Sequence, residues 1–312
     1  MSVILLSLLA CGDPDAPPPP TEVDAEVQQA PQARPEGPPG VHNAVSQMPR
    51  GPDPSGKYLR LARSDDGLTW TPQEGVLATA ASSPNLTVIN GAPVVLFVEH
   101  GEYLAQVPLT GGPSTRVALD AGDGLVVDPH VVALPDGGYR LYFIQQPREH
   151  DPGARLENEV RSARSADGRT WTVEAGVRMK GLLVDPDVVP LREGGWRMFL
   201  TQDAVNVKSA RSADGLDFEP EPGLRMTGGG VTSTLQVDDG WRMYFHSPGG
   251  IGLSLSDDGE TFHPTRDLLV RPDTRGGAVL GVESPSVLVR DGVWWMVYAA
   301  YGPEAMKEPA PR

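Results

Sequence analysis

The segment Asp136–Phe143 (DGGYRLYF) places a glycine-containing turn directly before a strand-like run of residues. Four other segments repeat this design: Asn90–Phe97 (NGAPVVLF), Glu193–Leu200 (EGGWRMFL), Asp239–Phe245 (DGWRMYF) and Asp291–Tyr298 (DGVWWMVY). An Asn-Gly or Asp-Gly pair between apolar segments is the strongest short-range signal of a β-hairpin, because both turn positions favour positive φ. The sequence therefore predicts a hairpin at each of these five positions.

A short motif precedes each hairpin, where the first of its two strands begins. The motifs are Ser83-Pro84-Asn85, Asp128-Pro129-His130, Asp185-Pro186-Asp187, Thr232-Ser233-Thr234 and Glu283-Ser284-Pro285. They recur at intervals of roughly 45–57 residues, which is the length of one four-stranded propeller blade. The chain is therefore expected to repeat a blade of antiparallel strands.

A second repeat lies out of phase with the first. Its copies are Ser64–Trp70 (SDDGLTW), Ser165–Trp171 (SADGRTW), Ser212–Phe218 (SADGLDF) and Ser256–Phe262 (SDDGETF). This pattern resembles the Asp-box of sialidases and related propellers, which occupies the turn between the third and fourth strands of a blade. Asp and Thr side chains suit such a turn because they bind nearby backbone N–H groups. We interpret these acids as staples of the turn rather than as ligands or catalysts.

Counting the repeats predicts the architecture. The last hairpin ends near Tyr301, before the chain can form a third and fourth strand, and the orphan hairpin at Lys57–Leu77 can supply them. Such closure leaves no open sheet edge. We therefore predict an all-β fold: a five-bladed β-propeller closed by N-terminal strands that complete the last blade.

The composition bears on possible partners. The 312 residues include 36 Gly and 32 Pro, as a turn-rich β protein requires, and the formal net charge is −15. A nucleic-acid partner is not expected, since a phosphate backbone calls for a basic face. We expect a monomer without a cofactor, and leave open a structural Ca²⁺ ion in the channel.

The N-terminal region predicts a location. The apolar run Val3–Ala10 precedes Cys11, the only cysteine, and Leu8–Cys11 (LLAC) resembles the lipobox of bacterial lipoproteins, although the usual basic residues before the apolar run are missing. That resemblance implies a membrane-anchored protein of the bacterial cell envelope, periplasmic or surface-exposed, held through an N-terminal lipid only. A cytosolic protein with a buried cysteine is the alternative. The expected divisions are a signal peptide at 1–10, a Pro-rich disordered tether at 11–56, a propeller at 57–302 and a tail at 303–312.

In a propeller, the first strands of all blades begin at one end of the central channel, and the turns between second and third strands overhang that same end. Polar side chains should therefore converge there, as a carbohydrate site requires. Those at the strand starts are Asn85, Asp128, His130, Asp185, Asp187, Thr232 and Glu283, and those at the turns include Gln145, Gln202 and His246. Polar strand ends are also common in any β protein, which is the alternative interpretation.

The Asp-Pro and Glu-Ser-Pro motifs resemble those of the five-bladed glycosidases of the arabinanase, xylosidase and invertase group. The resemblance implies that Asp128 and Asp185 supply a base or nucleophile and a tuning aspartate, and that Glu283 is the general acid. That family places its acids on consecutive blades, whereas here a blade with only hydroxyls separates Asp185 from Glu283. Sialidase chemistry is not expected, because no matching arginine triad opens these strands.

Two functions remain open from the sequence. The first is a glycoside hydrolase that uses Asp128, Asp185 and Glu283, with Asn85, His130, Asp187, Gln145, Gln202, Thr232 and His246 in contact with the glycan. The second is a non-catalytic propeller that binds a glycan or a protein through the same residues. The fold hosts both classes and does not choose between them.

Overall fold

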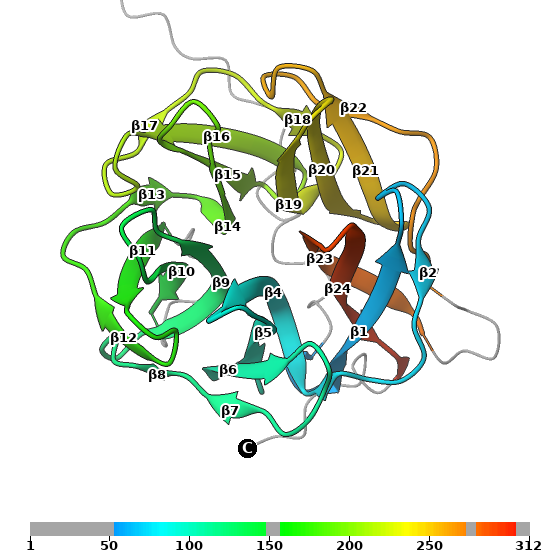
Figure 1. The fold of residues 1–312 in the computed structure, drawn as a ribbon, viewed down its shortest axis with the longest axis horizontal. Coiled ribbons are helices and arrows are strands. Elements are labelled where there is room, and N and C mark those ends of the chain that lie inside the picture. Colours follow the sequence, from blue (N-terminus) through cyan, green and yellow to red (C-terminus); the bar gives the residue numbers. More distant parts are fainter. Residues whose placement is uncertain (1–52, 148–156, 273–278, 304–312) are drawn as a thin grey trace, which may run out of the picture. The chain divides into compact units, whose positions relative to one another are not determined.

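A computed structural model describes residues 53–147, 157–272 and 279–303. They form five sheets, each with antiparallel principal strands, arranged as blades around a central axis, which confirms the predicted five-bladed propeller (Figure 1). The predicted signal peptide, Cys11, the predicted tether as far as residue 52 and the predicted tail beyond residue 303 lie outside the described residues. The last residues of the segment predicted to be a disordered tether, Pro54–Gly56, form a 3-10 turn. Within the described part of the chain, no helix has the length and apolar character needed to cross a bilayer.

Four blades are continuous in sequence, and each runs outward from the channel. Blade 1 contains β4 (Ala81–Ile89), β5 (Ala92–Glu99), β6 (Tyr103–Pro108) and β7 (Thr115–Arg116). Blade 2 contains β9 (Leu125–Ala133), β10 (Tyr139–Gln146), β11 (Asn158–Ser165) and β12 (Thr170–Val173). Blade 3 contains β14 (Leu183–Pro190), β15 (Trp196–Gln202), β16 (Asn206–Ser212) and β17 (Glu219–Pro220). Blade 4 contains β19 (Gly230–Val237), β20 (Gly240–Ser247), β21 (Gly250–Ser256) and β22 (His263–Pro264).

Blade 5 joins the two ends of the described chain. Its inner strands are β23 (Gly281–Arg290) and β24 (Val293–Tyr301), and its outer strands are β1 (Lys57–Ser64) and β2 (Thr71–Pro72). The pairing runs without interruption from Lys57 opposite Tyr301 to Ser64 opposite Trp294. The predicted closure is therefore confirmed: N-terminal strands cover the sheet edge that the last hairpin would otherwise expose.

Shorter elements supplement the four principal strands of the blades. They are the 3-10 turn η3 (Pro54–Gly56) and the strands β3 (Ala78–Thr79), β8 (Ala118–Leu119), β13 (Met179–Gly181) and β18 (Met226–Thr227). β8 pairs with β12 in parallel, whereas β3, β13 and β18 pair antiparallel with the third strand of a blade.

Each Ser-x-Asp-Gly repeat forms the turn between the third and fourth strands of its blade. In the first copy, the Ser64 hydroxyl oxygen accepts a hydrogen bond from the Gly67 N–H at 2.8 Å. The Asp66 carboxylate accepts bonds from the N–H groups of Leu68 and Thr69 at 2.7 and 2.8 Å. These backbone donors lower the pKa of Asp66 to about 2, so its ionised carboxylate stabilises the turn.

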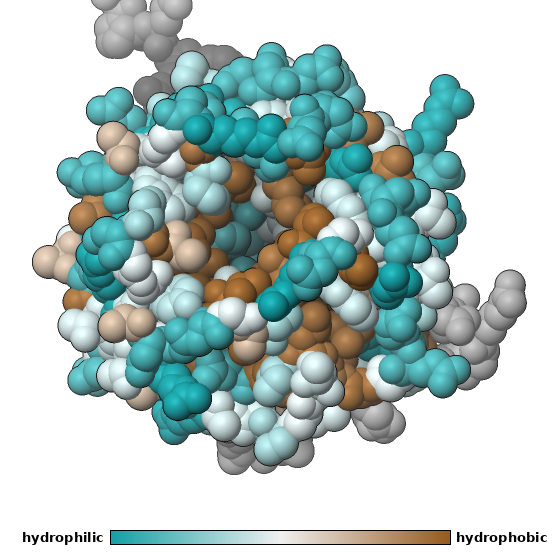
Figure 2. All heavy atoms as spheres, viewed as in Figure 1, coloured by the Kyte–Doolittle hydropathy of each residue, from teal (hydrophilic) through white to brown (hydrophobic). Residues whose placement is uncertain are grey.

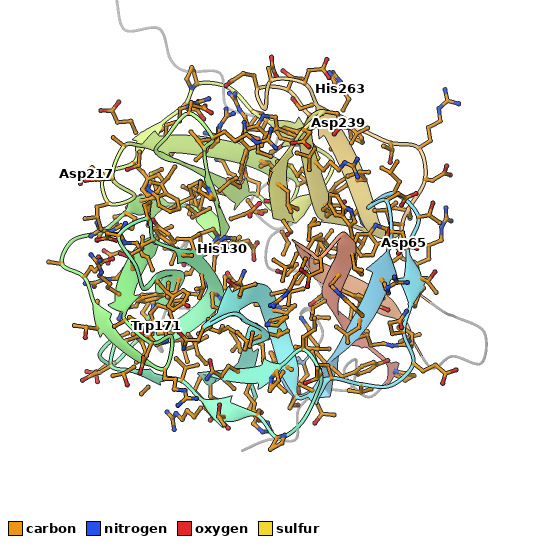
Figure 3. All side chains as sticks on the ribbon, viewed as in Figure 1. Asp65, His130, Trp171, Asp217, Asp239 and His263 are labelled. Carbon is orange, nitrogen blue, oxygen red and sulfur yellow. The ribbon has the colours of Figure 1, made fainter. Side chains whose placement is uncertain are left out.

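The same turns lock each blade to its neighbour. Tyr244, in blade 4, donates a hydrogen bond to the Gly67 carbonyl of blade 5 at 2.9 Å. Gly67 has φ of 70°, and an added Cβ would lie 2.8 Å from the Tyr244 hydroxyl, so this close approach requires glycine. The aromatic residue of the repeat also packs between blades: the ring of Trp70 meets that of Tyr244 edge to face, with centroids 5.7 Å apart. Trp171 lies within the body of the ring, whereas Asp65 and Asp217 lie toward its outside (Figure 3).

A β-bulge interrupts every inner strand near its start. Each bulge holds one non-glycine residue with φ between 46° and 54°, and the residues are Ser83, Asp128, Asp185, Val231 and Ser284. This corrects the sequence alignment of two blades by one residue, because Val231 and Ser284, rather than Thr232 and Glu283, correspond to Asp128. Left-handed conformation costs a non-glycine residue about 1–3 kcal/mol, so the surrounding strands must enforce it.

Proline follows the bulge residue in all inner strands except that of blade 4. Proline has no N–H group and is tolerated in a sheet only at an edge. Each inner strand is the edge of its sheet, since its second side is unpaired. The residues Pro84, Pro129, Pro186 and Pro285 are therefore compatible with strands that border the channel.

Candidate functional site

The bulges bring two predicted site residues into the channel. Asp128 and Asp185 occupy the bulge positions of blades 2 and 3, and both line a cavity on the axis to which all five inner strands contribute. Both side chains keep contact with the channel despite the surrounding protein, since neither residue is fully buried. The irregular backbone thus turns acids from neighbouring blades toward one another.

Asp128 and Asp185 form a coupled pair of carboxyl groups. Their side chains are joined by a hydrogen bond, and Asp128 also accepts bonds from the Asp185 N–H and from the Ser83 hydroxyl, the latter at 2.8 Å. Burial and the neighbouring charges of Asp128 and Glu283 raise the pKa of Asp185 well above its usual range, against a hydrogen bond with Thr201. Like charges this close disfavour double ionisation, so the pair holds a proton between its members, and we place it on Asp185.

Glu283 lies beside this pair at the start of β23. The Nζ atom of Lys57 is 2.5 Å from its Oε1 atom, and both side chains are 13% exposed. The negative charge of Glu283 raises the pKa of Asp185, and this effect is Coulombic rather than a hydrogen bond. His246 lies close enough for the charges of Glu283 and Lys57 to act on it, and burial lowers the pKa of this histidine. Glu283 is therefore close enough to both Asp185 and His246 for its charge to act on them.

Four other residues that were predicted to contact the glycan lie farther along the channel than the acids. Their side chains form hydrogen bonds with neighbouring blades. Asn85 accepts a hydrogen bond from the Val131 N–H at 2.8 Å, and a nitrogen of His130 lies 3.0 Å from the Val188 carbonyl oxygen. Asp187 accepts bonds from the Thr232 hydroxyl at 3.0 Å and from the Thr234 N–H.

Two serines at the equivalent position complete this arrangement. Ser233 accepts from the Val287 N–H at 2.9 Å, and Ser286 accepts from the Leu86 N–H at 2.8 Å. Every inner strand thus carries, two residues after its bulge, a side chain that bonds to the backbone of the next blade. We call these residues the belt: Asn85, His130, Asp187, Ser233 and Ser286. The backbone N–H and C=O groups at an unpaired strand edge need hydrogen-bond partners when they are buried. The belt contacts therefore stabilise the ring.

Two titratable groups of the belt face each other. His130 Nδ1 lies 3.8 Å from Asp187 Oδ1, and the Asp187 side chain is 2% exposed. Burial raises the pKa of Asp187 to about 7 and lowers that of His130 to about 4. His130 lies at the inner edge of the ring, beside the central opening (Figure 3). Both groups are therefore neutral in mildly acidic solution.

The predicted glutamines differ in their surroundings. Gln145 donates to the Ala121 carbonyl, in the segment before β9, and accepts from Arg161 of β11 at 3.1 Å, so both polar atoms of its amide bind other parts of the protein. Gln202 ends β15 at the same end of the ring as the acids and is partly exposed. Gln202 is thus the better placed of the two for an external ligand.

The belt separates two cavities along the axis. The cavity on the acid side reaches Asp128 and Asp185 and has a volume of about 40 Å³. The cavity beyond the belt measures about 390 Å³ and is bordered by aliphatic residues such as Val189, Leu235 and Leu288. Figure 2 shows a hollow at the centre of the ring with hydrophobic residues around it. The cavity on the acid side is therefore large enough for water but not for a sugar ring.

Three residues of the acid site were missed from the sequence. They are Lys57, Ser83 and Thr201, which contact Glu283, Asp128 and Asp185 respectively. Ring closure already places Lys57 at the start of a third strand, at the end of the channel where the acids lie, so this signal could have found it. Among the described residues, no group of three or more His, Cys, Asp or Glu side chains is arranged to hold a metal ion, which leaves the suggested calcium ion without identified ligands.

The chain matches no protein-family model and no curated protein. Its fold resembles that of a thermostable family-43 glycoside hydrolase, 11% identical, with a TM-score of 0.56 over 74% of this chain and 96% of the other. The GH43 protein BlXynB from Bacillus licheniformis is 13% identical, with a TM-score of 0.56 over 72% of this chain and 49% of the other. A family 117 glycoside hydrolase of Zobellia galactanivorans is 14% identical, with a TM-score of 0.51 over 71% and 84% of the respective chains. The chain thus shares the fold of glycoside hydrolase propellers.

Proposed function

We propose that this protein is a glycan-directed propeller that hydrolyses a glycosidic bond at its acid end. The observation that carries the proposal is the convergence of Asp128, Asp185 and Glu283 on one end of the channel. Glycoside hydrolysis needs one carboxyl group that donates a proton and a second that is ionised. The structural likeness to glycoside hydrolases supports a carbohydrate as the substrate class.

We base the proposed roles on the protonation pattern. Asp185 donates its proton to the leaving oxygen, because its pKa is raised well above the usual range. Asp128, which accepts bonds from the Ser83 hydroxyl and the Asp185 N–H, carries the negative charge of the pair. Asp128 and Asp185 are hydrogen-bonded to each other, so they are too close together to flank a glycosidic bond. The two carboxyl groups that do so lie about 5 Å or more apart.

Glu283 supplies the second carboxylate. Its Oε1 atom forms an ion pair with Lys57 at 2.5 Å, and we assign it the role of the proton acceptor. Glu283 therefore takes a proton from the attacking water while the oxygen of that water bonds to the anomeric carbon and the glycosidic C–O bond breaks. This assignment exchanges the roles of Glu283 and Asp185 that the family resemblance implied.

A non-catalytic glycan-binding propeller is the second candidate. The small size of the acid-side cavity favours it, because about 40 Å³ accommodates water rather than a sugar ring. A sugar bound at the mouth would still meet Gln202, His246 and the acids, with no requirement for turnover.

A substrate screen separates the two candidates. Wild type, Asp185→Asn and Glu283→Gln would be assayed on aryl-glycosides and polysaccharides, with Asp217→Asn, on an exposed turn, as the control. We expect both site variants to lose about 10²-fold or more in turnover while glycan binding persists, since general acid–base catalysis contributes about that much. Binding without hydrolysis of any substrate by the wild type would leave the second candidate.

We further propose that Cys11 carries a lipid that displays the propeller from a bacterial membrane. The support is the sequence Leu8–Cys11 followed by a Pro-rich segment. Metabolic fatty-acid label should enter the wild type but not Cys11→Ser. Incorporation of equal label by the variant would contradict the proposal.

A further inference from the structure

Lys57 reaches the acid site from the strand that closes the ring. It begins β1, opposite Tyr301 of β24, whereas Glu283 belongs to β23 and lies opposite Ala299. The Lys57 side chain therefore extends past the end of β24 to form its 2.5 Å ion pair with a residue 226 positions away. This contact joins the first and third strands of blade 5 at the channel mouth.

The other blades lack this pair. The first residues of their third strands are Tyr103, Asn158, Asn206 and Gly250. The residues that precede their bulges, at the position of Glu283, are Ser82, Val127, Val184 and Gly230. In none of these four blades do the two positions combine an acid with a base. The ion pair is therefore not a requirement of the blade.

The charge of Lys57 also acts on residues other than Glu283. The ammonium acts on both Asp128 and Asp185 and favours their ionised forms, against the effect of burial. Two partly buried acids next to a third need such a cation, because uncompensated charge in protein surroundings is costly. His246 does not supply it at neutral pH, because burial lowers its pKa.

We propose that Lys57 is a positioning residue of the acid site, delivered by ring closure: its ammonium orients the Glu283 carboxylate at the channel mouth and offsets the charge of the Asp128–Asp185 pair. The catalytic consequence rests on the proposed function, whereas the electrostatic role does not. The site is consequently incomplete until β1 has paired with β24.

Carboxyl-carbon NMR titration of the full chain tests this role without a substrate. The variants are Lys57→Met, the charge-conserving Lys57→Arg, and the control Lys180→Met, which removes an ammonium that is 57% exposed on blade 2. We expect the titration midpoints of Asp128 and Asp185 to rise by about one pH unit or more in Lys57→Met, since a nearby opposite charge has effects of that size. They should stay at the wild-type values in the other two proteins. Unchanged midpoints in a folded Lys57→Met would overturn the proposal.

Should Lys57→Met fail to fold, Glu283→Gln provides the second measurement. The amide keeps an oxygen for Lys57 and removes one negative charge, so the Asp185 midpoint should fall. An unchanged midpoint would overturn the proposal. If an active substrate is found, Lys57→Met should lower kcat more than it alters KM, and Lys57→Arg should restore kcat. Shifted titrations without hydrolysis by any variant or the wild type would reject the enzyme proposal and keep the role of Lys57.

Discussion

The Ser286 hydroxyl oxygen accepts a hydrogen bond from the backbone N–H of Leu86 at 2.8 Å, across 200 positions of the chain. Ser286 belongs to blade 5 and Leu86 to blade 1, so this bond spans the junction where the ring closes. It is one member of the belt, which supplies partners to strand edges that face the channel. The belt lies directly beneath the acid pair and holds blades 2 and 3, which carry that pair, side by side.

Replacing Ser286 by Ala should destabilise the ring. The Leu86 N–H would remain buried without its partner, at a cost of about 1–3 kcal/mol in unfolding free energy. Urea unfolding measures this change. Ser247→Ala is the control, since the Ser247 hydroxyl bonds within its own hairpin, to the Gly250 carbonyl. Equal stability of the two variants would argue against a role of the belt in closure.

Replacing Trp171 by Ala should cost about 3–5 kcal/mol, as large-to-small changes in a core do. Its ring is 4% exposed and packs in a cluster that includes Ile89 of blade 1 and Leu141 of blade 2. Thermal unfolding would show a clearly lower melting temperature. Leu68→Ala is the matched control, because Leu68 occupies the corresponding turn of blade 5 and is 45% exposed. A melting temperature equal to that of the control would contradict interblade packing by Trp171.

The belt pair His130 and Asp187 should give opposing pH dependences of stability. The pKa of Asp187 rises from 3.8 to about 7 on folding, so the folded state binds the extra proton and stability falls as pH rises from about 4 to 7. The pKa of His130 falls from 6.5 to about 4, so the unfolded state binds the extra proton and stability is lost as pH falls through that range. The two contributions oppose each other in the wild type.

Single variants expose each contribution. Relative to the wild type, the unfolding free energy of Asp187→Asn should rise with pH between about 4 and 7, and that of His130→Gln should fall between about 4 and 6.5. Each slope approaches about 1.4 kcal/mol per pH unit for one proton. Urea unfolding at several pH values measures these differences. Parallel pH profiles for all three proteins would show that neither group titrates as the burial of the pair requires.

Removal of the closing strands should destroy the propeller. Without 57–77, β24 has an unpaired edge, and such an edge promotes aggregation. Removal of 12–51 should instead leave a folded, soluble domain, because β1 and its partners remain. Size-exclusion chromatography and circular dichroism compare the two truncations. Similar behaviour of both would argue against the role of β1 in closure.

Local interactions explain how much of the fold the sequence could predict. The turn at Asp136–Gly138 depends on hydrogen bonds between residues a few positions apart, and so does the Ser64–Thr69 turn. The residue types that favour these turns are visible in the sequence. Counting these turns was sufficient to predict the five blades and the closure of the ring. The bulges were not predicted, because Val231 adopts φ of 50° although a β-branched residue ordinarily avoids it. Only the register with β20 reveals that conformation.

The sequence by itself thus determined which residue types lie at the channel: the acids Asp128, Asp185 and Glu283 and the polar side chains near them. The tertiary structure decided their depth, which separates Asp187 and His130, bound to neighbouring blades, from Asp185, which faces the channel. It also decided that Lys57 pairs with Glu283. The physical reason is that turn chemistry acts between neighbours in the chain, whereas depth and charge pairing depend on strand register across hundreds of residues.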